Sequence, residues 1–464
     1  MTRQPYTRAL DPKARDLALA LARRSAGTRR PGTAGPAPAA ADAAPRTGFD
    51  ALDGFKSMTA IGRVGQALGL VSPFFRLHEG HARTTTVIDG VECLNFSSYD
   101  YLGLNADPRP QAAAAQALQR YGVSASASRL VAGERPVHQA LETALAGHYG
   151  HKAALAFVSG HATNVSMIGA LLSGDDLIVH DAYIHNSVTT GARLSGAARR
   201  SFAHNDIGAL ARILDHSRPL HRNVLIVVEG LYSMDGDIPD LPALIDLKTR
   251  YNAWLMVDEA HALGCVGATG KGVFEHFGID PAAVDIWMGT LSKTLASTGG
   301  YVAGNADLIA FLNGHASGFV YSVALPPLLA AAALAALDIL QAEPDRAAKL
   351  QANARHFADR ATALGLDPGL GQGFGVMPVM VGDSARATKL SERLLARGIN
   401  VVPVTFPGVP MQMARLRFFL SSEHSTDQID QALTATREEL DRLDREGFGE
   451  IFARAASHLN MDIG

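Results

Sequence analysis

The stretches Trp254-Leu-Met-Val-Asp-Glu-Ala-His261 and Ile286-Trp-Met-Gly-Thr-Leu-Ser-Lys293 show the repeating pattern that decides the fold. Each begins with a short apolar run, typical of a buried β-strand, and continues into polar residues. Further apolar runs of this kind, separated by helical stretches, are Ala154–Val158, Leu177–Val179, Val224–Val228 and Tyr301–Ala303. Strands that alternate with helices predict an α/β domain, in which helices cover both faces of a mostly parallel sheet.

The C-terminal part of the chain predicts a smaller α+β unit. Apolar spacing indicates helices at Leu328–Leu340, 345–364, 388–397 and 426–442, and strands at Val376–Val381, Asn400–Val404 and Arg415–Leu420. The first 50 residues are rich in Ala, Pro, Arg and Gly, with one possible helix at Lys13–Arg24. We therefore expect a flexible N-terminal arm at 1–50, an N-terminal segment at 51–105, a large catalytic domain at 106–343 and a small C-terminal α+β domain at 344–464.

Composition and charge argue against several classes of function. The 464 residues contain no run near the roughly 18 apolar residues of a membrane span, so no membrane span is expected. A net charge of −3 with dispersed basic residues offers no surface for a nucleic-acid backbone. Cys93 and Cys265 are too few for a disulfide framework or a zinc site. We expect a cytoplasmic enzyme without a metal site.

Polar residues follow three of the predicted strands. Glu229 follows Val224–Val228, Asp258 follows Trp254–Val257, and Lys293 follows Ile286–Met288 after Gly289-Thr-Leu-Ser. In an open α/β sheet, ligands bind at the rim where the carboxyl ends of the strands meet. We therefore expect the chemistry of this protein at that rim.

Asp258 and Lys293 together favour a pyridine cofactor. A carboxylate at a strand end can keep a pyridine nitrogen protonated, which makes the ring an electron sink, although an acid after a strand is also typical of Mg²⁺ sites. A lysine whose amine is kept neutral can bind an aldehyde cofactor as a Schiff base, whereas a lone lysine is usually a solvated surface charge. His261, in Asp258-Glu-Ala-His261, accompanies both residues. It favours the cofactor over a Mg²⁺ site at Asp258 and over a surface charge at Lys293.

Two further loops and one late strand carry candidate ligands. Ser159-Gly160-His161 stands where a strand passes into a helix, a position that suits a phosphate group as well as simple capping by the serine. His185 can stack on an aromatic ring or be a buried structural residue. In Arg415-Leu-Arg417 the period of a strand places both arginines on one face. One of them can bind a substrate carboxylate, and the spacing does not decide which.

Taken in order, these motifs resemble the α-oxoamine synthases, which are pyridoxal 5'-phosphate (PLP) enzymes. The resemblance covers about residues 55–445 and is nearest to serine-palmitoyltransferase-like and polyketide-associated members. The segments that carry it are Asn95–Leu104, Ser128–Gly133, Ser159–Asn164, Glu229–Gly236, Val257–His261, Gly289–Lys293 and Ala414–Arg417. It implies the fold-type I PLP-dependent transferase fold (aspartate aminotransferase-like), with a large PLP-binding domain, and a homodimer with shared active sites.

The resemblance also implies a role for each candidate residue. Lys293 would hold the cofactor and move the α-proton, Asp258 would bind the pyridine nitrogen, His261 the phenolic oxygen, and His185 would stack on the ring. The remaining implied roles are phosphate binding by Gly160, His161 and Thr290, site lining by Glu229 and Ser233, carboxylate binding by Arg417, and a reach into the partner's site by Ser322. At Asp100 the chain departs from the family, which usually has Asn at position 99 or 100, so contacts to the substrate there are in doubt. Ser128 stands where glycine-restricted members have Thr, which implies room for an amino-acid side chain.

The reaction implied is a decarboxylative condensation. An amino acid (serine, alanine or glycine) would join an acyl thioester, carried by CoA or by an acyl carrier protein, to give an α-amino ketone, CO₂ and the free thiol. Two alternatives share part of the pattern. One is another fold-type I PLP enzyme, such as an aminotransferase or aldolase, and the other is a non-catalytic partner subunit, which typically lacks the lysine.

Overall fold

The computed structural model describes residues 48–67, 69–406 and 408–448. The expected arm, up to residue 47, and the expected helix Lys13–Arg24 lie outside the described residues. The described chain begins with a 3-10 turn, η1 (Phe49–Ala51), and the helix α2 (Asp53–Ala67). Among the described residues, no single helix is long and apolar enough to cross a membrane, and one pair, α12 with α13, meets the criterion only when joined across a 78° bend.

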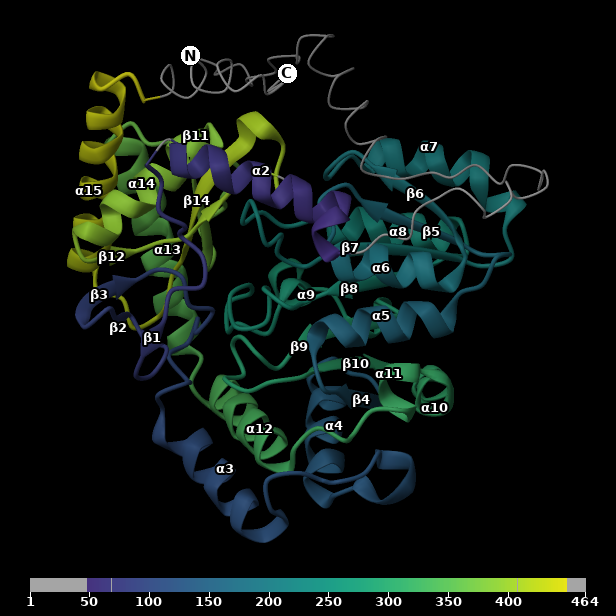
Figure 1. The fold of residues 1–464 in the computed structure, drawn as a ribbon. Helices are drawn as coiled ribbons and strands as arrows, with labels where there is room; N and C mark the ends of the chain where they lie inside the picture. The colour runs from purple at the N-terminus through teal and green to yellow at the C-terminus, as the bar shows by residue number, and fades with distance from the viewer. Residues whose placement is uncertain (1–47, 68, 407, 449–464) are drawn as a thin grey trace.

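A seven-stranded sheet forms the centre of the molecule (Figure 1), in the order β4-β10-β9-β8-β7-β5-β6. Its strands are β4 (Ala153–Phe157), β5 (Leu177–Asp181), β6 (Ala198–Phe202), β7 (Val224–Glu229), β8 (Trp254–Asp258), β9 (Ile286–Thr290) and β10 (Gly300–Gly304). Strand β10 runs antiparallel to both of its neighbours, and the other pairs are parallel. The predicted mostly parallel α/β sheet is therefore confirmed.

Helices cover both faces of this sheet because side chains of each strand alternate between two cores. In β7, Ile226 belongs to one buried cluster and Leu225 and Val227 to the other. The first cluster packs under α4 (Pro136–His148), α7 (Ile207–Ser217), α8 (Leu241–Arg250) and α12 (Pro327–Ala342). The second packs under α5 (Gly160–Leu171), α6 (Asn186–Ser195), α10 (Ala306–His315) and α11 (Ser317–Val320). The remaining helices of this part are α3 (Pro108–Tyr121) and α9 (Val273–Phe277), with short turns at Arg129–Gly133, Arg218–Leu220 and Pro281–Ala283.

Two small sheets complete the described chain. One consists of β1 (His78–Glu79), β2 (Thr85–Ile88), β3 (Val91–Asn95) and β12 (Ile399–Asn400), and the other of β11 (Val376–Gly382), β14 (Ala414–Phe419) and β13 (Pro403–Val404). The helices α13 (Asp345–Ala363), α14 (Ser384–Ala396) and α15 (Thr426–Arg445) and the turn η5 (Met411–Met413) belong to this part, which stands beside the central sheet in Figure 1. The α+β character predicted for the C-terminal part is present.

The prediction of one strand at Asn400–Val404 is wrong. Its first half pairs in parallel with β3, whereas Pro403 and Val404 pair antiparallel with β14 in a different sheet. Between the two halves, the Val402 N–H donates to Ser97 Oγ at 3.1 Å, so the chain leaves one sheet before it enters the next. As a result, the small sheet formed by β1, β2 and β3 gains its fourth strand, β12, from the C-terminal part of the chain.

Candidate active site

The ends of three neighbouring strands bring the predicted acidic and basic residues together. Glu229 and Asp258 are register partners at the ends of β7 and β8, and Asp258 lies opposite Met288 of β9. Lys293 follows β9 in the next loop, where burial lowers the pKa of its amine to about 8, although the nearby Asp258 opposes the effect. Since a more neutral amine is a better nucleophile at neutral pH, the arrangement has the chemistry expected of a Schiff-base lysine.

The Asp258 carboxylate is held on both oxygens. Its Oδ2 accepts a hydrogen bond from Asn164 Nδ2 at 2.9 Å, and its Oδ1 accepts from the Ala260 N–H at 3.0 Å. Asn164 also donates to Ser187 Oγ at 3.0 Å, which links β8 to α5 and α6. Asn164 lies in the segment Ser159–Asn164 but had no predicted role, because nothing in the sequence shows that α5 passes over the end of β8.

Glu229 is a second buried acid in the site. Burial, followed by the nearby Asp258 carboxylate, raises the pKa of Glu229 to about 8. Its Oε2 accepts the Ser233 N–H at 3.0 Å, and its Oε1 is buried without a hydrogen-bond partner among the described residues. Glu229 is therefore largely protonated at neutral pH.

His261 is buried and neutral. Burial, together with the positive charges of Lys293 and Arg417, lowers the pKa of His261 well below its ordinary value. Its Nδ1 lies 2.6 Å from the hydroxyl of Tyr101, a residue that the sequence analysis did not single out. Tyr101 comes from the loop after β3, far from His261 in sequence, so only the folded chain shows this contact. The bond fixes the orientation of the imidazole and leaves Nε2 for a ligand.

The start of α5 has the shape of a phosphate cradle. Ser159 caps the helix, its Oγ accepting from the Ala162 N–H at 3.0 Å. A side chain at Gly160 would place its Cβ 3.0 Å from Thr290 Oγ1, so glycine is what allows the helix to approach β9 so closely. His161 is exposed at the same helix start. Free N–H groups at a helix start are suitable donors to a phosphate group. The adjacent hydroxyl of Thr290 donates to the carbonyl oxygen of Gly299 at 2.9 Å, so in this structure it faces the cradle with its oxygen.

His185 stands at the start of the neighbouring helix α6. Its ring is 6.3 Å from that of His161, and its Nδ1 lies 2.7 Å from Ser187 Oγ. Partial removal of its ring from water lowers the pKa of His185, although the nearby Asp258 opposes the effect. The residue as a whole is exposed in the described chain, so His185 is not a fully buried histidine.

The structure distinguishes the two arginines of β14. Arg415 is buried, forms an ion pair with Asp235 and donates to the carbonyl oxygen of Met413. Arg417 is half-buried, lies 4.7 Å over the ring of Phe419, and donates to the carbonyl oxygen of Ser233 at 2.8 Å. Among the described residues, no carboxylate lies within ion-pair distance of Arg417. Of the two arginines, Arg417 is therefore the one whose guanidinium can bind a substrate carboxylate.

The remaining predicted residues lie in different places. Ser128 stands directly before the turn Arg129–Gly133, and Ser322 stands between α11 and α12. Within the described part of this chain, neither makes a hydrogen bond to Lys293, Asp258 or His261. Asp100 lines a cavity of about 390 Å³, and Lys293 is on the wall of the same cavity.

The residues of this rim fit PLP. The buried Glu229 Oε1 and Arg417 Nε without partners, and the close approach at Gly160, are what a ligand-binding site requires. The Mg²⁺ alternative is not supported by the donor set, since no group of three or more His, Cys, Asp or Glu side chains in the described residues is arranged to hold a metal ion. A phosphate cradle, a carboxylate, an imidazole and an amine are instead present together.

Comparison with known proteins identifies the family. Residues 91–435 match the model of the class I and II aminotransferases. The chain is 38% identical over 367 residues to 8-amino-7-oxononanoate synthase of Symbiobacterium thermophilum, covering 79% of this chain and 93% of that protein. It is 41% identical over 361 residues to the enzyme of the same name from Methylococcus capsulatus, covering 78% and 92%.

Comparison with solved structures points to the same family. Serine palmitoyltransferase of Sphingomonas wittichii superposes with a TM-score of 0.79 at 31% identity, covering 84% of this chain and 98% of that one. A structure described as SPT with a PLP internal aldimine gives a TM-score of 0.80 at 29% identity, with the same coverage. The chain belongs to the class I and II aminotransferase family and, within it, to the α-oxoamine synthases.

The family confirms the predicted fold, cofactor and reaction. This α-oxoamine synthase has the fold-type I transferase fold and is a PLP-dependent acyltransferase. Its reaction is the decarboxylative condensation of an amino acid with an acyl thioester. The alternatives of an aminotransferase or aldolase and of a non-catalytic subunit are therefore not favoured.

Proposed function

We propose that Lys293 is the residue that binds PLP and moves the α-proton of the amino acid during the condensation. The observation that carries this proposal is the half-buried Lys293, whose amine pKa is lowered by desolvation to about 8 close to Asp258 and Glu229 at the ends of β8 and β7. When bound, PLP supplies an electron sink for the carbanion formed at the α-carbon.

Each of these side chains has one task. Asp258, oriented by Asn164, binds the pyridine nitrogen and keeps its proton in place. His261, oriented by Tyr101, donates to the phenolic oxygen. The remaining proposed contacts are His185 against the ring face, the start of α5 at Gly160 and His161 with Thr290 for the phosphate, and Glu229 and Ser233 as lining residues.

The substrates are proposed from Arg417, whose charge acts on Lys293, and from Ser128, through the resemblance to the family. Arg417 binds the carboxylate of the amino acid, and the candidates are serine, alanine and glycine, since Ser128 leaves room for a small side chain. The acyl donor is a thioester of CoA or of an acyl carrier protein. We also propose a cytoplasmic homodimer in which Ser322 reaches the site of the partner subunit.

The experiment is an assay of the purified PLP-loaded enzyme with a panel of amino acids and acyl-CoA donors, recording free CoA and CO₂. We expect the release of both, coupled to formation of an α-amino ketone. Lys293→Ala should lose the yellow absorbance of lysine-bound PLP together with turnover. The matched control is Lys271→Ala, because Lys271 is an exposed lysine of the loop after β8. Conversion of the amino acid to a keto acid without release of CoA would instead show an aminotransferase.

The proposed homodimer has its own measurement. Light scattering during size-exclusion chromatography should give about twice the chain mass of 48.9 kDa. A single-chain mass at micromolar concentration would contradict the dimer, and with it the role of Ser322.

A further inference from the structure

Two aromatic rings lie between the amine of Lys293 and the guanidinium of Arg417. The amine lies over the ring of Tyr99, with Nζ 5.5 Å from the ring centroid. The guanidinium of Arg417 lies 4.7 Å from the centroid of Phe419. The two rings meet edge to face, with their centroids 4.6 Å apart and an angle of 74° between their planes. Each of these two cations therefore has its own aromatic face, within the distance of a cation–π contact.

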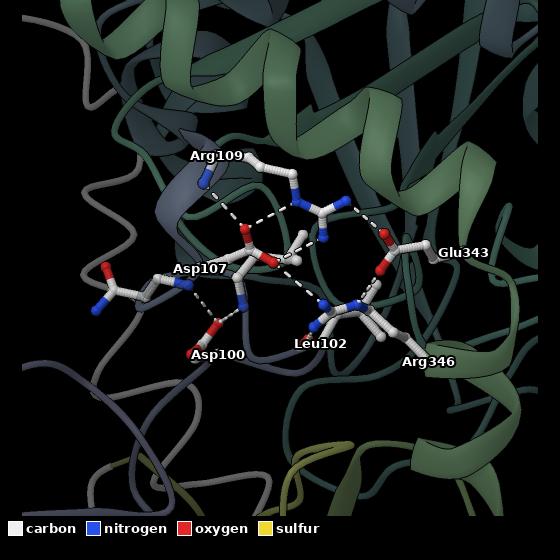
Figure 2. A network of polar contacts seen from close by, with 8 residues as sticks. Asp100, Leu102, Asp107, Arg109, Glu343 and Arg346 are labelled. Atoms are coloured by element: carbon white, nitrogen blue, oxygen red, sulfur yellow. Dashed lines mark hydrogen bonds and ion pairs between the residues drawn. The ribbon is translucent and has the colours of Figure 1, made fainter. Parts of the chain in front are cut away.

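The loop that carries Tyr99 is fixed by the residue that follows it. Asp100 Oδ1 accepts hydrogen bonds from the N–H groups of Leu104 at 2.8 Å and Asn105 at 3.1 Å (Figure 2). In the same view, Arg346 donates at 2.9 Å to a carbonyl oxygen of this loop. Tyr99 is on the wall of the cavity that Lys293 also lines. The ring therefore has a defined place beside the amine, although the residue is 38% exposed.

A ring attracts a cation without neutralising it. Within the described part of the chain, no carboxylate lies within ion-pair distance of Lys293. The pKa of its amine, lowered by burial to about 8, leaves the amine mostly protonated at pH 7. An ion pair would cancel this charge and occupy its N–H donors, whereas the face of a tyrosine does neither. Contact with Tyr99 is thus suited to an amine that must stay in place and still be free to react.

We propose that Tyr99 is a positioning residue for Lys293, whose amine it holds against its ring whenever the amine is not bound to the cofactor. The inference rests on the proposed function, in which Lys293 binds PLP and moves the α-proton. Both tasks need the free amine at one place, although its flexible four-carbon stem allows many. The contact favours the ammonium form, so removal of the ring should make this amine easier to deprotonate.

The test measures the amine of Lys293 in the full-length chain without PLP. Competitive acetylation with acetic anhydride at a series of pH values, followed by mass spectrometry of the peptide that contains Lys293, gives the pH at which the amine is half protonated. In Tyr99→Leu this midpoint should fall by about half to one pH unit, the equivalent of a cation–π contact in a partly desolvated site. Tyr99→Phe keeps the ring and should keep the midpoint of the wild type.

The design isolates the ring from the other influences on this amine. Because Tyr99 is 38% exposed, we expect both variants to fold, and thermal unfolding checks this. The other titratable groups that act on the amine are unchanged in both variants, namely Asp258, Glu229, Arg417, Cys265, His185 and His261.

Tyr121→Leu is the matched control. The ring of Tyr121 also has a cation over it, since the guanidinium of Arg120 lies 5.2 Å from its centroid, but it stands at the end of α3 and outside the cavity wall. This variant should leave the midpoint of Lys293 unchanged. The same midpoint in Tyr99→Leu as in the wild type, or an equal fall in Tyr99→Phe, overturns the inference.

The proposed function is tested separately by adding PLP to the same proteins. Yellow absorbance in the wild type, lost in Lys293→Ala, supports the role of Lys293 whatever the midpoints are. Absence of this absorbance in the wild type would overturn the proposed function and the role of Tyr99 with it.

Discussion

The two arginines of β14 illustrate how far side-chain chemistry follows from spacing. Their separation by one residue predicted a shared face, and both contact the segment 233–235 in the structure. Their roles could not be predicted, because the partner of Arg415 is Asp235, which lies far away in the sequence. The same holds for Asn164 and Tyr101, whose contacts with Asp258 and His261 join separate parts of the chain.

These environments predict different outcomes for one substitution at the two positions. Arg415→Met leaves the buried Asp235 without its partner and should lower the free energy of unfolding by about 3–5 kcal/mol. Arg417→Met removes no ion pair, so it should change the unfolding temperature little and raise KM for the amino acid by about tenfold or more. Thermal unfolding of both variants measures the change in stability, and steady-state kinetics measures the change in KM. A higher KM in Arg415→Met alone would mean that the roles are reversed.

At the scale of the element, buried strands were predictable and exposed ones were not. The apolar runs of β4, β7, β8 and β9 lie within one or two residues of the strands observed, because both faces of these strands are covered. Strand β6 was missed, since Ala198-Arg-Arg-Ser-Phe202 forms the edge of the sheet and exposes Arg199 and Arg200. The strands β1 to β3 were also missed, as they are short and half-exposed.

A histidine joins the end of β5 to the loop after β7. His204 Nδ1 lies 2.9 Å from Asp181, and its Nε2 lies 2.8 Å from Asp237. Although burial lowers it, the two carboxylates raise the pKa of His204 to about 9. A pKa raised above the ordinary value of about 6.5 stabilises the fold fully below that pH, and the contribution is lost as the pH rises through about 9.

We therefore expect the unfolding temperature of the wild type to fall more steeply between pH 6.5 and 9.5 than that of His204→Gln. The contribution lost is on the order of 3 kcal/mol, the equivalent of the rise in pKa. His216→Gln, at an exposed histidine of α7, is the control and should follow the wild type. Parallel pH profiles of wild type and His204→Gln would show that His204 is not charged in the folded protein.

At the scale of the whole molecule, the sequence predicted domain boundaries at about residues 105 and 343, and we propose that these boundaries divide the described chain into three parts. The three parts are not independent in the structure. Strand β12 of the C-terminal part extends the sheet of the N-terminal segment, and Asn400 Nδ2 donates to Asn95 Oδ1 at 3.0 Å. Contacts between residues so far apart in sequence leave no local pattern, which is why the motifs located the catalytic rim but not the walls of its cavity.

One side chain touches all three parts of the division. Arg346, at the start of α13, donates to the carbonyl oxygen of Leu102 at 2.9 Å and pairs with Asp107 at 3.1 Å. Arg346→Met should lower the free energy of unfolding by about 2 kcal/mol, since a half-buried charged hydrogen-bond network loses its centre. Scanning calorimetry should show the loss, and Arg355→Met, at an exposed arginine of the same helix, should not change the midpoint. An unchanged midpoint in Arg346→Met would show that the parts are held together by apolar packing instead.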